Sequence, residues 1–125
     1  AVAAPFDVAV LLVGWNDAMR LRAGAAFGRD LGALLDRLAA ASPDARLVVV
    51  GPPAFERFAV MPQPLRMALG ASADGLRRVA ARVAREHGAL IAPGFDGRSV
   101  ASDGFHPDVA GYASLAVGIA AVLPE

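Results

Sequence analysis

Val8-Ala9-Val10-Leu11-Leu12-Val13 is an unbroken apolar run, and Gly14-Trp15-Asn16-Asp17 follows it directly. A short run that is rich in valine and stops at a glycine is typical of a strand buried within a parallel sheet. Two further runs of this kind occupy residues 47–50 and 89–92, and each is followed by glycine or proline. The sequence therefore predicts three buried parallel strands.

Segments with helical spacing alternate with these strands. Between the first two strands, leucines recur at every third or fourth position, at Leu31, Leu34, Leu35 and Leu38. A second such pattern spans residues 76–83, and a third follows Pro107, a residue type that favours the first position of a helix. This last segment is apolar on most sides, so we expect it to be well buried. The proline-rich residues 52–70 are expected to form a long loop. The alternation of strands and helices predicts an α/β fold with a parallel sheet and helices on its faces.

The composition excludes several classes of protein. The chain has 125 residues, of which 56% are hydrophobic and 19% charged, so it is not intrinsically disordered. Equal numbers of basic and acidic residues give a net charge of zero, which argues against nucleic acid as a partner. There is no cysteine, which excludes disulfides and thiolate metal sites. The uncharged residues 109–123 are fewer than the ~20 needed to span a bilayer.

Polar residues gather where the three predicted strands end. They form the clusters 14–17, 51–53 and 102–107. In open parallel sheets, ligands bind beyond the carboxyl ends of the strands. We therefore expect all three clusters to lie on one rim of the sheet.

Asp103 and His106 form the first candidate for chemistry. A carboxylate beside a histidine accepts the imidazole N–H, fixes the tautomer and stabilises the imidazolium that forms when the other nitrogen takes a proton. The alternative is structural, with Asp103 making a turn and His106 capping the helix that follows.

Asn16 is the second candidate, because it follows a strand and a glycine. A carboxamide at this position is suited to donate a hydrogen bond to a developing oxyanion. The alternative is an Asn-Asp turn in which Asp17 caps the next helical turn.

Taken together, the pattern Gly14-x-Asn16-Asp17 and the later Asp103-x-x-His106-Pro107 resemble the third and fifth conserved blocks of the SGNH hydrolase superfamily. These are the GDSL-type esterases, lipases and acylhydrolases, and the resemblance covers nearly the whole chain. It implies a three-layer flavodoxin-like fold and an acyl-transfer mechanism with a Ser-His-Asp triad. It also implies a small-molecule ester or lipid as substrate, and no cofactor or metal.

By position, the resemblance implies a role for each residue of the two motifs. His106 is expected to be the general base and acid, and Asp103 to orient it. Asn16 is expected to be an oxyanion-hole donor, and Gly14 to keep the turn tight near the reacting carbonyl. Trp15, at the variable position, is expected to form a wall of the pocket.

The chain departs from the family pattern in lacking the Gly-Asp-Ser block that holds the nucleophile. Its serines are Ser42, Ser72, Ser99, Ser102 and Ser114, none of which lies in such a block. We therefore expect residues 1–125 to be the C-terminal part of a single SGNH hydrolase domain. The nucleophilic serine would lie upstream, on the same protein or on another chain, and this part alone would be inactive. In a strand order of 2-1-3-4-5, the present strands would be the last three.

Other interpretations remain open at this point. Phe55 and Phe58 either line an acyl pocket beside Trp15 or anchor their loop to the core. A flavodoxin-like binding module without catalysis, or an inactive fragment, is the main alternative to an esterase. A metal site that uses Asp103 and His106 is a third possibility.

Overall fold

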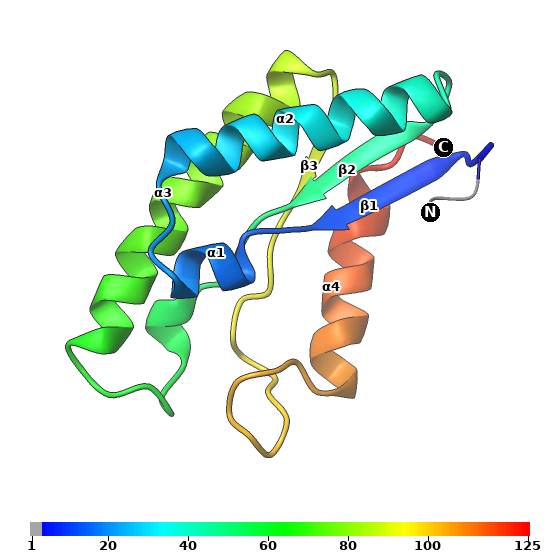
Figure 1. Ribbon diagram of the computed structural model, residues 1–125. Coiled ribbons are helices and arrows are strands. Elements are labelled where there is room, and N and C mark those ends of the chain that lie inside the picture. Colours follow the sequence, from blue (N-terminus) through cyan, green and yellow to red (C-terminus); the bar gives the residue numbers. More distant parts are fainter. Residues whose placement is uncertain (1–3) are drawn as a thin grey trace.

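Three parallel strands form the middle layer of the structure, and they lie side by side in the order in which they occur in the sequence. The computed structural model describes residues 4–125. The strands are β1 (Val8–Leu12), β2 (Arg46–Val50) and β3 (Leu90–Ala92), as Figure 1 shows. β2 is the central strand and pairs in parallel with both others. All three predicted strands are thus confirmed, with shifts of one residue at their ends.

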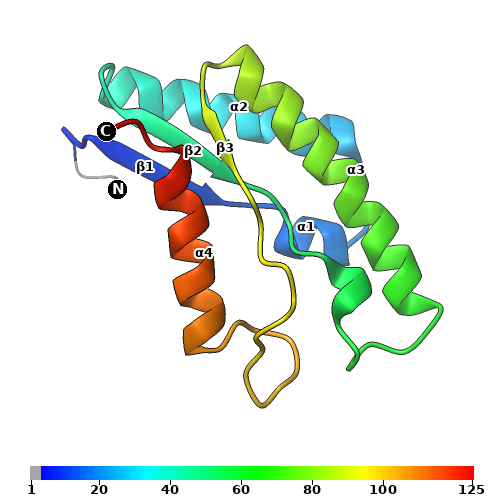
Figure 2. The ribbon, with the colours of Figure 1, turned by 180° about the vertical axis from the view of Figure 1, so that it is seen from behind.

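Helices cover both faces of this sheet, which confirms the predicted α/β class. The long helices α2 (Gly24–Ala41) and α3 (Leu65–Glu86) lie on one face, and α4 (Val109–Val122) lies on the other (Figures 1 and 2). Two short segments, the helix α1 (Trp15–Met19) and the 3-10 turn η1 (Phe55–Arg57), follow the ends of β1 and β2. The molecule therefore has three layers, with the loops that follow the strands at one edge.

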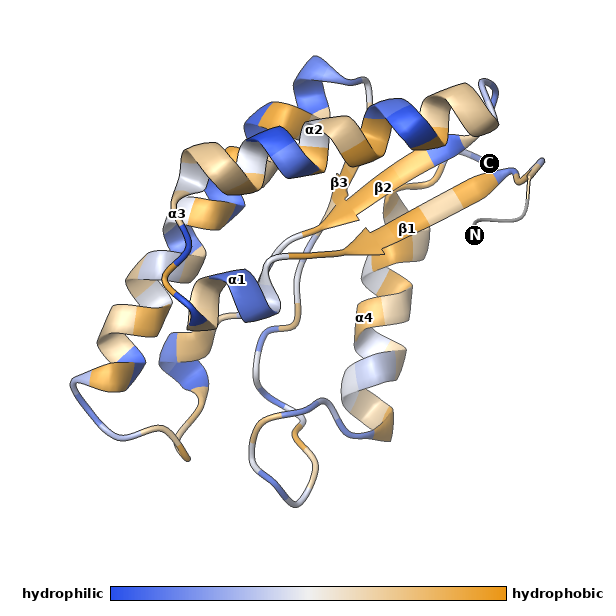
Figure 3. Cartoon of the chain, in the orientation of Figure 1, coloured by the Kyte–Doolittle hydropathy of each residue, from blue (hydrophilic) through white to orange (hydrophobic). Residues whose placement is uncertain are grey.

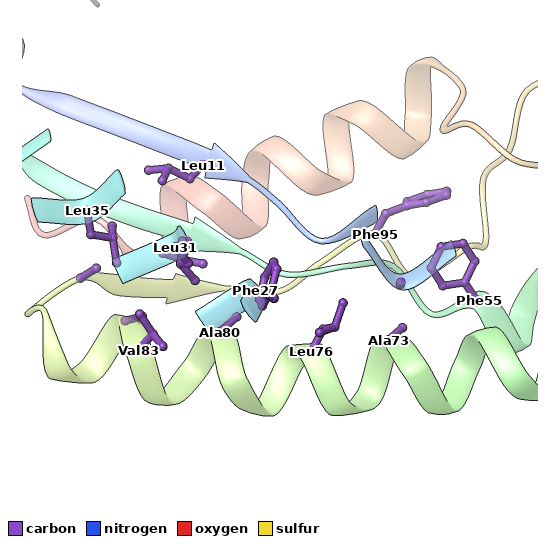
Figure 4. Packing of buried hydrophobic residues seen from close by; sticks show 14 of the residues in the cluster. Leu11, Phe27, Leu31, Leu35, Phe55, Ala73, Leu76, Ala80, Val83 and Phe95 are labelled. Carbon is purple, nitrogen blue, oxygen red and sulfur yellow. The ribbon is translucent and has the colours of Figure 1, made fainter. Parts of the chain in front are cut away.

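The main hydrophobic core lies between the sheet and the two long helices. Leu11 and Val49 point into it from β1 and β2, and Phe27 and Leu35 do so from α2. Figure 4 shows Leu31, Leu76, Ala80 and Val83 completing this layer from the two helices. Three of the leucines that predicted the first helix, Leu31, Leu35 and Leu38, thus mark the face that it buries, whereas Leu34 is exposed.

The opposite face of the sheet is covered only in part. Val48, Val50 and Ala92 are buried there, packed against Leu115 and Ile119 of α4. On the same face, the side chains of β1 at positions 8, 10 and 12 are exposed. α4 therefore lies against β2 and β3 and leaves the β1 side open.

The prediction that the last helix is well buried is wrong for the part of the chain that the structure describes. Gly111 is its one buried residue, and the large side chains of Val109, Tyr112 and Val117 are exposed. Figure 3 shows that α4 is nevertheless mostly apolar along its length. Within residues 4–125, no helix is long and apolar enough to cross a membrane.

The structure also corrects two expected boundaries. α3 begins at Leu65, inside the segment expected to be a loop, and Pro64 stands at its N-cap. The prolines end at position 64, so the residues that follow are free to donate helical hydrogen bonds. α4 begins at Val109 and not at Pro107, because the Asp108 carboxylate accepts the N–H of Gly111 at 2.8 Å and caps the helix.

Gly111→Ala is expected to destabilise the fold. A Cβ at this position would lie 2.5 Å from the Ser99 carbonyl oxygen and 2.9 Å from Pro107 Cβ. These atoms belong to the loop that holds Asp103 and His106, so relief of the clash displaces that loop. We expect a loss of about 1–3 kcal/mol in the free energy of unfolding, measured by urea denaturation.

Gly75→Ala is the matched control, because a Cβ there meets no atom within 4 Å. Gly75 lies inside α3, where alanine is favoured over glycine by about 0.5–1 kcal/mol, so this variant should gain stability. Equal losses in both variants would contradict the packing argument.

Candidate active site

The three polar clusters predicted to share a rim line one cavity. Its wall includes Trp15 from the first cluster, Gly51 and Pro53 from the second, and His106 and Pro107 from the third. A backbone hydrogen bond of 3.0 Å from the Val13 N–H to the Val50 carbonyl continues the β1–β2 pairing up to this edge. Parallel pairing therefore brings together segments from both ends of the chain.

Gly14 turns the chain sharply from β1 into α1. Its φ is +92°, a conformation that favours glycine, and a Cβ there would lie 3.0 Å from Pro52 Cδ. The predicted tight turn is therefore present. Asp17 does not cap α1, contrary to the structural alternative; its carboxylate pairs with Arg22 at 3.0 Å instead.

Asn16 lies exposed in the first turn of α1, directly after Trp15. Within residues 4–125, its carboxamide has no hydrogen-bond partner, and no hydrogen bond joins it to His106. The cavity wall includes Trp15 and His106 but not Asn16, Gly14 or Asp103. The carboxamide N–H groups of Asn16 therefore have no acceptor in the described part of the chain and lie outside the cavity wall.

Asp103 and His106 lie in a hydrogen-bonded loop between β3 and α4. The Ala101 N–H donates to the His106 carbonyl at 2.8 Å, and the Asp108 N–H donates to the Ser99 carbonyl at 3.0 Å. Gly104 closes the turn with a φ of +70°. These bonds fix the backbone on which both side chains are carried.

The Asp103 carboxylate contacts both the loop backbone and the imidazole. Its Oδ1 accepts the N–H groups of Phe105 and His106 at 2.9 and 3.0 Å, and its Oδ2 lies 2.6 Å from His106 Nδ1. The bond to the imidazole, followed by the two backbone bonds, lowers the pKa of Asp103 to about 2. Asp103 is therefore charged at neutral pH and holds the His106 ring through Nδ1, which leaves Nε2 free to exchange a proton. Of the structural alternative, the turn made by Asp103 is present, since its Oδ1 accepts the N–H groups two and three residues ahead. The other half, in which His106 caps the helix, is wrong, because Asp108 does so.

An aromatic cluster surrounds Trp15. The rings of Phe55, Phe58, Phe95 and Phe105 all have centroids within 6.5 Å of its indole. Phe55 and Phe58, considered as walls of an acyl pocket, are 0% and 1% exposed and do not line the cavity. Their burial favours the other interpretation, in which they anchor their loop to the core. Both rings also pack against the indole of Trp15.

The cavity has a volume of about 170 Å³ and a mostly apolar wall. Six of its lining residues lie outside the clusters predicted from the sequence: Leu12, Val13, Val50, Phe95, Tyr112 and Leu115. Leu12 ends β1 and Phe95 follows β3 closely, so their positions at strand ends were the available signal. Tyr112 belongs to α4, and only the packing of that helix places it at the rim.

The described residues hold no group of three or more histidine, aspartate or glutamate side chains arranged to bind a metal ion. Asp103 and His106 thus have no third ligand of this kind beside them within residues 4–125.

A model of the GDSL-like lipase/acylhydrolase family matches residues 1–114. The chain therefore belongs to this family of hydrolases, which confirms the resemblance carried by the motifs around Asn16 and His106. Among curated protein sequences, none matches the chain.

Solved structures of three hydrolases have the same fold. Phospholipase A1 from Streptomyces albidoflavus NA297 is 20% identical with a TM-score of 0.68, over 92% of this chain and 68% of that one. An extracellular lipase from Streptomyces rimosus is 19% identical with a TM-score of 0.61, over 90% and 69%. LAE5, an alpha/beta hydrolase enzyme from the metagenome of Lake Arreo, Spain, is 20% identical with a TM-score of 0.65, over 93% and 59%. The present chain thus spans less than two thirds of LAE5.

Removal of the imidazole should raise the pKa of Asp103. The bond to His106 is the largest cause of the lowered value, so His106→Ala is expected to return the pKa from about 2 toward the ordinary value of 3.8. Because the folded-state pKa is the lower one, the charged carboxylate stabilises the fold above pH ~4, and this contribution is lost as the pH falls toward about 2. Carboxyl carbon shifts followed by NMR measure the change. His87→Ala, which removes a distant histidine, should leave the Asp103 titration in place, and an unaltered titration in His106→Ala would contradict the assignment.

Proposed function

We propose that this chain provides the acid–base side of the active site of a serine ester hydrolase. His106 is the general base and acid, and Asp103 orients it. The observation that carries the proposal is the 2.6 Å contact between Asp103 Oδ2 and His106 Nδ1, on a ring that lines an apolar cavity. Membership of the GDSL-like lipase/acylhydrolase family supports the same reaction class.

The chemistry is acyl transfer in two steps. A serine hydroxyl attacks the ester carbonyl while His106 Nε2 takes its proton, and the carbonyl oxygen becomes an oxyanion. The imidazolium then gives that proton to the alcohol as the carbon–oxygen bond breaks. Water, deprotonated by the same nitrogen, then attacks the carbonyl carbon of the acyl-serine. The bond from this carbon to the serine oxygen breaks, the imidazolium returns its proton to that oxygen, and the carboxylic acid leaves. Throughout, Asp103 stays charged and stabilises the imidazolium.

Asn16 is proposed as a donor to the oxyanion. It follows Trp15, a residue of the cavity wall, and it is exposed and its carboxamide makes no hydrogen bond within residues 4–125. A carboxamide N–H that points at the developing oxyanion stabilises the charge that forms in the transition state. Gly14 supports this role, because its positive φ starts α1 at the rim.

The nucleophilic serine is proposed to come from a segment upstream of this chain. Among the described residues, no serine hydroxyl bonds to the His106 ring, and those of Ser42 and Ser72 bond instead to the Phe6 N–H and the Ala18 carbonyl. The edge position of β1 supports the proposal, since within residues 4–125 its outer backbone groups have no strand partner and a further strand would pair with them. The apolar side chains that β1 exposes on the α4 side would need a further element packed over that face.

The acyl group of the substrate is proposed to occupy the rim cavity. An apolar cavity of about 150 Å³ accommodates benzene. The present cavity of about 170 Å³ is therefore matched to an acyl group of roughly six carbons. Its walls hold few polar groups apart from His106 and Tyr112, which suits an uncharged chain.

A fluorophosphonate probe tests this function in the intact enzyme. The reagent phosphonylates serines whose hydroxyl is activated by a base, and mass spectrometry of the peptides locates the adduct. We expect hydrolysis of p-nitrophenyl butyrate and one adduct, on a serine outside residues 1–125. His106→Ala should abolish both. An adduct on Ser102 would overturn the upstream nucleophile, and the absence of both hydrolysis and labelling would overturn the hydrolase.

Asn16→Ala should lower kcat for ester hydrolysis by about 10²–10³-fold, the usual cost of losing one oxyanion donor. The free energy of unfolding should change little, because the carboxamide makes no internal hydrogen bond. Met19→Ala, an exposed change on the same helix, is the control and should leave kcat in place. A kcat for Asn16→Ala close to that of the control would remove Asn16 from the mechanism.

A further inference from the structure

Trp15 lines the cavity and also stacks on the imidazole of His106, a contact that lining the cavity does not require. Its indole and the His106 imidazole are nearly parallel, with 8° between their planes and 5.9 Å between their centroids. Phe95 is parallel to the same indole within 8°, at 6.5 Å. We propose that Trp15 is a positioning residue, whose ring face holds the imidazole of His106 in the orientation that proton transfer needs. The inference rests on the proposed function.

His106 needs such support because it is exposed. Its side chain is 62% accessible and that of Asp103 is 49% accessible, so water competes for the bond between them. That bond fixes one edge of the ring, at Nδ1, but a single contact at an edge does not prevent the ring plane from tilting. A flat partner against the face restricts the tilt. The two contacts together aim Nε2 in one direction.

Trp15 is itself held rigidly. Phe55 packs edge-on against the indole at 5.9 Å and is fully buried, and Phe105 packs edge-on at 5.0 Å. Phe105 also meets the imidazole edge-on at 5.3 Å, so it contacts both members of the stack. The indole is thus held in place by buried aromatic side chains. Through its contact with the exposed imidazole of His106, it restricts the motion of that ring as well.

The charge of the reacting histidine adds to this role. A cation within about 6 Å of an indole centroid is attracted by the ring face, and tryptophan is the strongest of the aromatic residues in this respect. The imidazolium that forms during acyl transfer lies at this separation, at 5.9 Å. The contact therefore favours the charged intermediate as well as the orientation of the ring.

Steady-state kinetics separate a positioning residue from a wall of the acyl site. Loss of a wall raises KM and leaves kcat in place, whereas loss of an interaction made only in the transition state lowers kcat. In the intact enzyme, Trp15→Leu is expected to lower kcat by about 10–100-fold, the scale associated with a displaced catalytic group, with KM changed by no more than about twofold. Trp15→Phe keeps a ring face and should restore most of the loss.

A second measurement does not depend on activity. The proton on His106 Nδ1, shared with Asp103, should give a resolved low-field NMR signal in the wild type and in Trp15→Phe. In Trp15→Leu, the freed ring should let this proton exchange with water, and the signal should be lost. If Trp15→Leu does not fold, Trp15→Met, which fills more of the space without a ring, takes its place in both measurements.

Phe27→Leu is the matched control, since it removes a buried aromatic ring outside the cluster around Trp15. It should reduce stability while kcat and the NMR signal are retained. An equal loss of kcat in Phe27→Leu, or a raised KM with unchanged kcat in Trp15→Leu, would overturn the proposal. If the wild type hydrolyses no ester, the proposed function fails, and the NMR signal alone then tests the contact between Trp15 and His106. Retention of the signal in Trp15→Leu would overturn the positioning role of Trp15, and loss of the signal would support that role.

Discussion

Parallel pairing of β2 with both of its neighbours is the constraint on which the site depends. All three strands point the same way, so the loops that follow them meet at one edge although they come from opposite ends of the sequence. Close packing of these loops needs glycine. A Cβ on Gly94, after β3, would lie 2.9 Å from the Gly51 carbonyl oxygen, after β2. The contact between the two loops thus depends on the absence of a side chain.

At this edge the structure combines one local and one long-range arrangement. Asp103 and His106 are three residues apart, and the loop backbone brings them together through hydrogen bonds that the Asp103 carboxylate itself accepts. The stacking of Trp15 on His106 joins the two ends of the chain and exists only once the sheet has formed. The first arrangement keeps Asp103 charged, and the second is the contact that we propose sets the plane of the ring.

This division explains what could be predicted from the sequence. Runs of valine and leucine marked the strands, and the close spacing of Asp103 and His106 pointed to their contact, because both patterns are local. The burial of Phe55 and Phe58 and the place of Tyr112 in the cavity wall depend on packing between distant segments, which no local pattern encodes. The exposure of α4 was missed for a related reason. Apolar composition indicates that a helix packs against other apolar surfaces. It does not indicate which sides of α4 are covered by residues 4–125.

Because α4 carries no charge, different interactions hold the helix and the loop that precedes it. From Val109 to Val122 the helix has no ionisable side chain except Tyr112, so apolar contacts with β2 and β3 hold it against the sheet. The loop before it depends on the exposed pair of Asp103 and His106, in which the carboxylate is charged. Excluded salts such as sulfate strengthen apolar burial, whereas dissolved ions of any kind screen an exposed pair. Sulfate therefore acts in opposite directions on the helix that forms one side of the cavity and on the loop that carries His106.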